Sequence, residues 1–142
     1  MKIVVDSREQ KPLWTGDKIE RRKLEVGDYS IRGAEDKIAI ERKSLGDLFG
    51  TLGANQRRFK SELDKAINYD YFAIVIDGSY SSCVNKDFRG SHFSRMRGYV
   101  ITSILFTMHL KYGINIFFAN SRDESRKIIK DIFKAYIKLY MK

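Results

Sequence analysis

Two runs, Asp28-Tyr29-Ser30-Ile31 and Lys37-Ile38-Ala39-Ile40-Glu41-Arg42, decide the fold of this chain. They flank the polar turn Gly33-Ala34-Glu35-Asp36 and predict a β-hairpin. Because successive side chains of a strand point to opposite faces, Glu41 and Lys43 share one side of the second strand. A carboxylate and an amine are therefore held together at the end of one strand.

The residue types in this hairpin suit the hydrolysis of a phosphodiester. The pair Gly27-Asp28 precedes the first strand, and Glu41-Arg42-Lys43 ends the second. Such hydrolysis at neutral pH calls for a divalent metal on hard oxygen ligands and a charged group that positions the attacking water. Asp28 and Glu41 are the predicted metal ligands, and Lys43 is the predicted catalytic amine.

The remaining pattern predicts an α/β fold with a mixed central sheet flanked by helices. Strands are expected at 3–6, 19–24, 71–76 and 114–119, the third of these as a strand buried on both faces. Helices are expected over 45–67 with a weak join at its glycines, over 91–112, and after Ser121, where Ser121 and Glu124 form a capping box. The segment 79–90, which contains Cys83, is expected to be a polar loop in which this cysteine has no special role.

Composition indicates a single, basic, intracellular domain. Its 142 residues predict a single domain over 1–142, and one cysteine indicates a reducing, intracellular environment. The net charge of +9 indicates a partner with negative charge, for which nucleic acid is the natural candidate. No signal peptide or membrane-spanning segment is expected.

Three motifs in order carry a family resemblance. Val5-Asp6-Ser7-Arg8-Glu9, then Val26-Gly27-Asp28-Tyr29, then Glu41-Arg42-Lys43 with Asp47 four residues later, resemble the nuclease domain of the XPF, Hef and Mus endonucleases. The resemblance implies a PD-(D/E)XK, restriction-endonuclease-like fold. It also implies Mg²⁺- or Mn²⁺-dependent cleavage of DNA near branches, flaps or forks, in repair or recombination.

The first motif adds candidates to the site. Asp6 ends the first strand, where neighbouring strands could bring it beside the other carboxylates, so we expect it to bind metal or a metal-bound water; capping the following turn is the alternative. Arg8 is expected to grip phosphate or orient the acidic cluster, with Glu9 holding Arg8; a surface ion pair is the alternative.

Supporting roles follow from the resemblance for two more residues. The backbone carbonyl of Arg42 could supply another oxygen ligand. Asp47 lies near the start of the helix after Lys43, where a favourable interaction with the helix dipole is the ordinary explanation.

Basic residues give candidates for DNA binding. Arg57 and Arg58 precede Phe59 on a predicted helix, and either could correspond to the arginine that the family carries there. Arg95 and Arg97, like Arg8, could contact the DNA backbone, although solvated faces are an equal alternative.

Two further functions and an assembly remain open. The chain could be a non-catalytic DNA-binding scaffold subunit, or a Holliday junction resolvase on the same fold. Family members commonly carry a helix-hairpin-helix region after the nuclease domain, so the resemblance implies either a stand-alone form without that region or a part of a longer protein. The terminal helix has an apolar surface wider than one sheet face would bury, with Phe133 and Tyr136 on it, so we expect a homodimer formed by this helix and helix 91–112. The alternative is that the terminal helix lies in a groove of its own domain.

Overall fold

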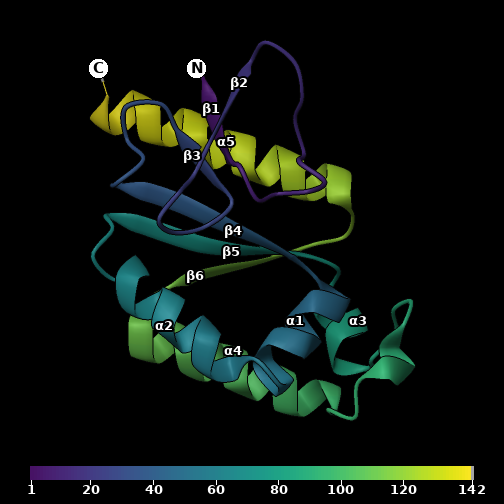
Figure 1. The fold of residues 1–142 in the computed structure, drawn as a ribbon. Helices are drawn as coiled ribbons and strands as arrows, with labels where there is room; N and C mark the ends of the chain where they lie inside the picture. The colour runs from purple at the N-terminus through teal and green to yellow at the C-terminus, as the bar shows by residue number, and fades with distance from the viewer. Residues whose placement is uncertain (142) are drawn as a thin grey trace.

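The computed structural model describes residues 1–141, and its centre is a six-stranded mixed sheet (Figure 1). The strands are β1 (Ile3–Asp6), β2 (Ile19–Arg22), β3 (Tyr29–Ile31), β4 (Ile38–Ser44), β5 (Tyr71–Asp77) and β6 (Asn115–Ala119). They lie in the order β2-β1-β3-β4-β5-β6. The β1/β3 and β3/β4 pairs are antiparallel, whereas β1/β2, β4/β5 and β5/β6 are parallel. The mixed α/β fold predicted from the sequence is confirmed.

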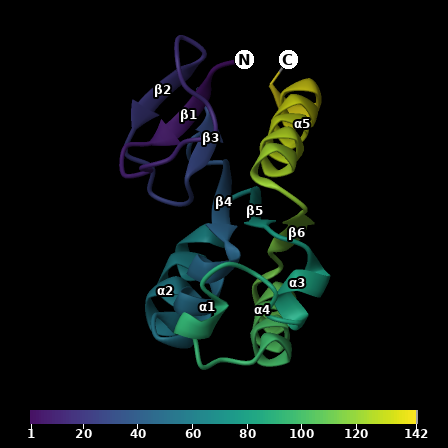
Figure 2. The ribbon, with the colours of Figure 1, turned by 90° about the vertical axis from the view of Figure 1, so that its right-hand side faces the viewer.

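Helices cover the two faces of the sheet unequally (Figure 2). One face carries α1 (Leu45–Gly53), α2 (Gln56–Ala66), the short α3 (Tyr80–Val84) and α4 (Gly98–Tyr112). The other face is covered by α5 (Arg122–Tyr140), with Ile129 and Phe133 buried against β1, β3, β4 and β5. Because β5 lies between these two layers, its central residues are buried on both faces, as predicted.

The predicted hairpin is formed by β3 and β4, and its register places the two motifs together. Tyr29 pairs with Ile40, so in an antiparallel ladder the preceding Asp28 lies beside the following Glu41. Gly27 has φ 76°, and a Cβ there would lie 3.0 Å from the carbonyl oxygen of Ile40. Only glycine permits both this backbone conformation and this close approach. The glycine at position 27 is therefore a structural requirement of the site.

The region before α4 differs from the prediction. The helix expected over 91–112 begins only at Gly98, after a single 3₁₀ turn at Ser91–Phe93. A Cβ at Gly98 would lie 2.1 Å from the carbonyl oxygen of Val84, so α4 can begin against α3 only with glycine there. The expected polar loop 79–90 contains α3, and Cys83 is fully buried in the core under it.

The helix ends mostly follow the predicted capping. Ser121 accepts a hydrogen bond from the backbone N–H of Glu124, while Glu124 accepts one from the backbone N–H of Asn120. The predicted capping signature is thus confirmed, with the return bond shifted by one residue. Across residues 1–141, none of the helices has the length and apolar character needed to cross a membrane.

Candidate active site

The site is centred on two neighbouring carboxylates, Asp28 immediately before β3 and Glu41 in the middle of β4. The backbone N–H of Asp28 donates to the carbonyl of Ile40 at 2.9 Å, and the backbone N–H of Arg42 donates to Asp28 Oδ2 at 2.8 Å. Lys43 Nζ lies 2.8 Å from Glu41 Oε2 and 5.3 Å from the centre of the Phe59 ring. The alternation expected along β4 is therefore observed, with Glu41 and Lys43 on one side.

Burial makes the charges of this site interact strongly. Glu41 is only 7% exposed. Burial and then the charge of Glu41 raise the pKa of Asp28 well above its ordinary value. Burial by itself would lower the pKa of Lys43, but the charge and hydrogen bond of Glu41, together with the charges of Asp28 and Glu62, raise it. The carboxylates thus repel each other in the absence of a cation, while the lysine stays charged at neutral pH.

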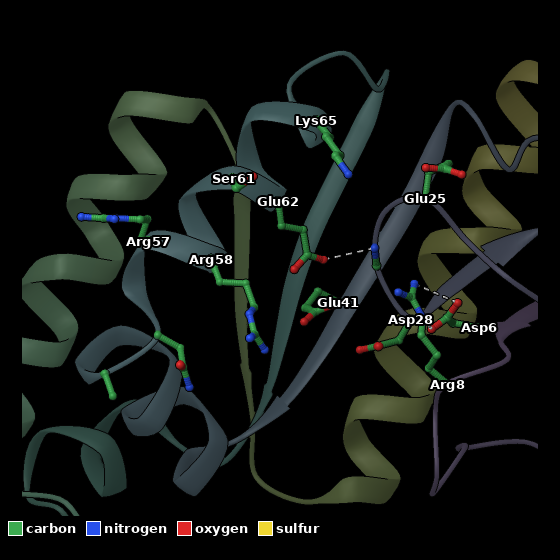
Figure 3. A pocket seen from close by; sticks show the side chains of 13 residues that line it. Asp6, Arg8, Glu25, Asp28, Glu41, Arg57, Arg58, Ser61, Glu62 and Lys65 are labelled. Carbon is green, nitrogen blue, oxygen red and sulfur yellow. Dashed lines mark hydrogen bonds and ion pairs between the residues drawn. The ribbon is translucent and has the colours of Figure 1, made fainter.

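Two clefts meet at this pair (Figure 3 shows the first). The first cleft has a volume of about 850 Å³ and runs from β1 to helix α2. The second, of about 980 Å³, runs along the start of α1 to the beginning of α5. Asp28, Glu41 and Asn55 line both clefts. A ligand lying across the two would therefore pass over the carboxylates.

Asp6 lies on the wall of the first cleft but is engaged by other groups. Arg8 Nε donates to Asp6 Oδ2 at 2.9 Å, and the backbone N–H of Leu24 donates to Asp6 Oδ1 at 2.8 Å. Arg8 also donates to the carbonyl of Leu24 at 2.9 Å. The geometry thus shows Asp6 positioning Arg8, and its expected role as a ligand of metal or of a metal-bound water stays a prediction.

The expected pairing of Glu9 with Arg8 is wrong. Glu9 instead lies 4.0 Å from Arg42 Nη1 and accepts a hydrogen bond of 3.4 Å from the Tyr29 hydroxyl. The Arg42 side chain extends to the other face of β4, where its Nη2 lies 2.6 Å from Asp77 Oδ2. Arg42 therefore stabilises β4 through its side chain while its backbone N–H holds Asp28.

Asp77 was not identified from the sequence. Its second carboxylate oxygen accepts a hydrogen bond from the buried Ser125 hydroxyl of α5. With Arg42, these residues connect β4, β5 and α5 immediately behind the site. No sequence signal marked this network, because its members are far apart along the chain.

Glu62 of α2 is the second functional candidate that the sequence did not reveal. It lines the first cleft opposite Glu41, and its Oε1 accepts a hydrogen bond of 3.4 Å from the backbone N–H of Gly27. Burial and then the charge of Glu41 raise the pKa of Glu62 to about 7. A sequence signal does exist for Glu62. It follows the buried Phe59 by three residues and precedes the buried Leu63, so helical periodicity places it at the border of the buried face of α2.

The remaining residues predicted from the sequence differ in whether they line one of the two clefts. Arg57 and Arg58 both line the first cleft, and Figure 3 shows Arg58 extending toward Glu41 while Arg57 extends away. Asp47 lines the second cleft, and its backbone N–H is capped by Ser44 at 3.1 Å in the first turn of α1. Arg95 and Arg97 precede α4 and line neither cleft.

The donor set fits a magnesium-type ion that is completed by its substrate. Within residues 1–141, no group of three or more His, Cys, Asp or Glu side chains is arranged to hold a metal ion. Mg²⁺ is usually bound by one or two carboxylates together with waters and substrate phosphates. The half-buried Asp28 and the buried Glu41 are two carboxylates with mutually unfavourable charges and could hold such an ion.

A model of the ERCC4 domain matches residues 5–132, which include every residue of the site described above. The chain belongs to the ERCC4 domain family. The fold agrees with this assignment. XPF from Aeropyrum pernix superposes with a TM-score of 0.70 and 21% sequence identity, covering 95% of this chain and 61% of that one.

Two more comparisons extend the picture of this ERCC4 domain. XPF from Aeropyrum pernix in complex with DNA gives a TM-score of 0.72 at 21% identity, over 96% of this chain and 65% of that one. A protein of Methanocaldococcus jannaschii, "Putative ATP-dependent RNA helicase MJ1505", is 26% identical over 132 residues. That alignment covers 91% of this chain and only 15% of the relative.

Proposed function

We propose that this ERCC4 domain is a Mg²⁺- or Mn²⁺-dependent endonuclease that cuts DNA near branches, flaps or forks. The observation that carries the proposal is the convergence of Asp28 and Glu41, with Lys43 beside them, at the junction of two clefts. The ERCC4 family assignment and the net charge of +9 support it. A polyanion crossing both clefts would place one phosphate over the carboxylates.

Each residue of the site would have a different role in hydrolysis. Asp28 and Glu41 would hold the metal, which lowers the pKa of bound water and stabilises charge that grows on the scissile phosphate. Because Glu41 raises the pKa of Lys43, its ammonium stays protonated. Lys43 can therefore donate hydrogen bonds to the attacking water or to a phosphate oxygen, but it cannot take a proton. Arg8, held by Asp6, is placed to contact phosphate in the first cleft.

The experiment that tests this function is cleavage of a DNA panel. Flap, fork, four-way and linear substrates are incubated with the protein in Mg²⁺, in Mn²⁺ and in a chelator. We expect cutting near the branch with either metal and none in the chelator. Asp28→Asn keeps the size and the acceptor for the backbone N–H of Arg42 but removes a charge, so its cutting should fall sharply.

The panel also separates the two alternatives. A scaffold subunit would bind branched DNA without cutting it in either metal. A Holliday junction resolvase would cut four-way junctions symmetrically and leave flaps intact. Equal cutting by the parental protein and Asp28→Asn would refute the site.

We also infer that two copies associate through α4 and the end of α5. Large apolar side chains are exposed on these elements: Tyr99, Phe106 and Leu110 on α4, and Leu139 and Tyr140 on α5. Edge strand β6 lies between the two helices on the same side of the molecule (Figure 2). An edge strand flanked by exposed apolar groups favours pairing with a second chain.

The surface offered by α5 is smaller than the sequence suggested. Phe133 is completely buried against its own sheet, and Tyr136 is nearly so. The alternative of a helix packed within its own domain is therefore confirmed for this part of α5. The large exposed apolar side chains of α5 that remain for a partner are Leu139 and Tyr140 in its last turn.

A further inference from the structure

A third groove lies away from the carboxylates, on the face of the sheet that α5 covers. It has a volume of about 360 Å³ and is formed by β1, the segment after β1 and α5. Its apolar lining comes from Met1, Ile3 and Trp14, and its basic lining comes from Lys18, Arg126, Lys127 and Lys130. We call this feature the Trp14 groove.

The Trp14 groove is connected to the active-site clefts through basic residues. Arg122 lines the second cleft, and it also lines a small hollow of about 160 Å³ with Leu13 and Arg126. Arg126 in turn lines the Trp14 groove. A continuous path of shared residues therefore leads from the carboxylates, over the beginning of α5, to Trp14.

The backbone along this path is fixed. Arg122 Nη2 donates to the carbonyls of Lys11 at 3.1 Å and of Pro12 at 2.8 Å, which ties the segment after β1 to α5. Trp14 packs against Tyr29 with ring centroids 5.3 Å apart and an interplanar angle of 85°, and it stays partly exposed. The indole is thus held in place and keeps part of its surface open to the groove.

The groove keeps a net positive charge after its ion pairs are counted. Asp123 pairs with Arg126 and lies 3.2 Å from Lys127 Nζ. The one carboxylate is shared by two of the four cations. Neither Lys18 nor Lys130 has an ion-pair partner among residues 1–141. The groove is therefore complementary to a chain of negative charges.

We propose that the Trp14 groove binds the unpaired single strand of a branched DNA substrate, with a base stacked on Trp14 and phosphates held by Lys18 and Lys130. This proposal rests on the proposed nuclease function. It assigns the path of the strand that leaves the active site, along Arg122 and Arg126. A basic groove that contains an aromatic side chain is the arrangement by which proteins bind single strands without sequence preference.

Size and chemistry favour a single strand over a duplex. The Trp14 groove has less than half the volume of either active-site cleft. Duplex bases already stack on one another, so only an unpaired base can offer its face to the indole. Charge alone would not distinguish nucleic acid from an acidic peptide, but the indole within the basic lining does.

Trp14 also provides the test, because it is the only tryptophan of the chain. Oligothymidylate is titrated into the protein in a chelator, where no strand is cut, and tryptophan fluorescence is followed. We expect saturable quenching. An abasic oligonucleotide of the same length and charge should bind more weakly and leave the fluorescence nearly unchanged. Equal quenching by the abasic chain or by polyglutamate would overturn the stacking.

Charge variants on α5 locate the binding. Lys130→Glu should weaken oligothymidylate binding about tenfold and flatten its salt dependence, because phosphate contacts release counterions. Lys138→Glu makes the same change of charge on the same helix outside the groove, and it should bind like the parental protein. If both variants lose similar affinity for oligothymidylate, the loss reflects the overall charge of the protein, and the assignment of the binding site is overturned.

A second variant tests the indole directly. Trp14→Leu removes the stacking platform, so its binding is followed by the anisotropy of a labelled oligonucleotide. Loss of one stacked base should weaken binding about tenfold. Circular dichroism checks that the variant is folded. Parental affinity in folded Trp14→Leu contradicts the proposal.

Cleavage separates a failure of this proposal from a failure of the nuclease function. With a flap substrate, Lys130→Glu should raise the DNA concentration needed for half-maximal cutting, whereas a nick without an unpaired arm should be unaffected. If the parental protein cuts nothing but its fluorescence is still quenched, the nuclease function fails and the groove stands. If it cuts flaps without any quenching, the groove assignment fails alone.

Discussion

Two regions of the molecule have unusual burial, in opposite senses. One is the cleft around Glu41, and the other is the surface formed by α4, edge strand β6 and the end of α5, here called the α4–β6–α5 edge. In the cleft, charged side chains are withdrawn from water, with Glu41 7% exposed. At the edge, apolar side chains are left in water, with Leu110 81% exposed. Each arrangement is unfavourable in the isolated chain, because buried charges lose hydration and exposed apolar surface orders water. The proposed function supplies each region with a partner that would relieve it, a cation for the cleft and a second copy of the chain for the edge.

The largest effect on stability is expected from a charge placed at Phe133, an apolar residue of α5 that is buried in the core. Phe133→Asp should destabilise the fold by about 5 kcal/mol or more, because it removes a buried ring and introduces a buried charge. Urea unfolding followed by circular dichroism measures the change. A folded Phe133→Asp protein of near-parental stability would place Phe133 in the interface and not in the core.

Leu110→Glu is the matched change on the exposed side of the same comparison. Its side chain contacts solvent in the isolated chain, so folding should change little. If α4 forms the two-fold interface, light scattering at micromolar concentration should give about twice the monomer mass for the parental protein and the monomer mass for this variant. A parental protein that stays monomeric at high concentration, with or without branched DNA, rules out the dimer.

A smaller effect is expected from the buried charge of Glu62 in metal-free protein. Its pKa is raised to about 7, so the folded state is penalised when the carboxyl ionises. Without metal, stability should fall as the pH rises from the unfolded-state pKa near 4.5 toward 7, by about 3 kcal/mol.

In a chelating buffer, Glu62→Gln should remove the part of the pH dependence that Glu62 contributes and leave the part due to Asp28, whose pKa is also raised. Asp64→Asn, an exposed carboxylate two residues further along α2, is the control and should keep the parental profile. Thermal unfolding at pH 5 and pH 8 measures both variants. An unchanged pH dependence in Glu62→Gln would mean that this carboxylate does not carry the buried charge.

The smallest effect concerns DNA binding at the rim of the cleft. Arg58→Ala should lower the slope of log affinity against log salt by about one unit, without introducing any sequence preference. Arg95→Ala, which removes the same charge outside both clefts, should leave the slope unchanged. A larger effect from Arg95 would move the DNA path to the segment before α4.

The sequence predicts the cleft better than the edge, and the reason is physical. Asp28, Glu41 and Lys43 lie on one hairpin, so two-residue alternation and a short turn suffice to bring them together. Glu62 and Asp77 reach the same region from distant elements, and their positions depend on how α2 and β5 pack. Arg8 has Asp6 and Glu9 nearby along the chain, and its partner Asp6 is set by the turn after β1, in which the backbone N–H of Glu9 donates to the carbonyl of Asp6.

At the edge, the width of an apolar stripe does not say what covers it. The sequence of α5 shows Phe133 and Leu139 as equally apolar, yet the sheet buries Phe133 and ends before Leu139. The start of α4 could not be predicted from the sequence either, because Gly98 is required there only by its close approach to Val84. Tertiary packing decides both outcomes.

Single-turnover cleavage by Glu41→Ala tests the central claim most directly. Asp36→Asn, which alters an exposed carboxylate in the turn at the opposite end of the same hairpin, is the matched control. Both are assayed in Mg²⁺ on the branched substrate that the parental protein cuts best, after circular dichroism confirms folding. We expect Glu41→Ala to cut at least ~100-fold more slowly, the loss typical when a key stabiliser of transition-state charge is removed, and Asp36→Asn to cut at the parental rate. Parental cutting by Glu41→Ala would contradict the assignment of the active site.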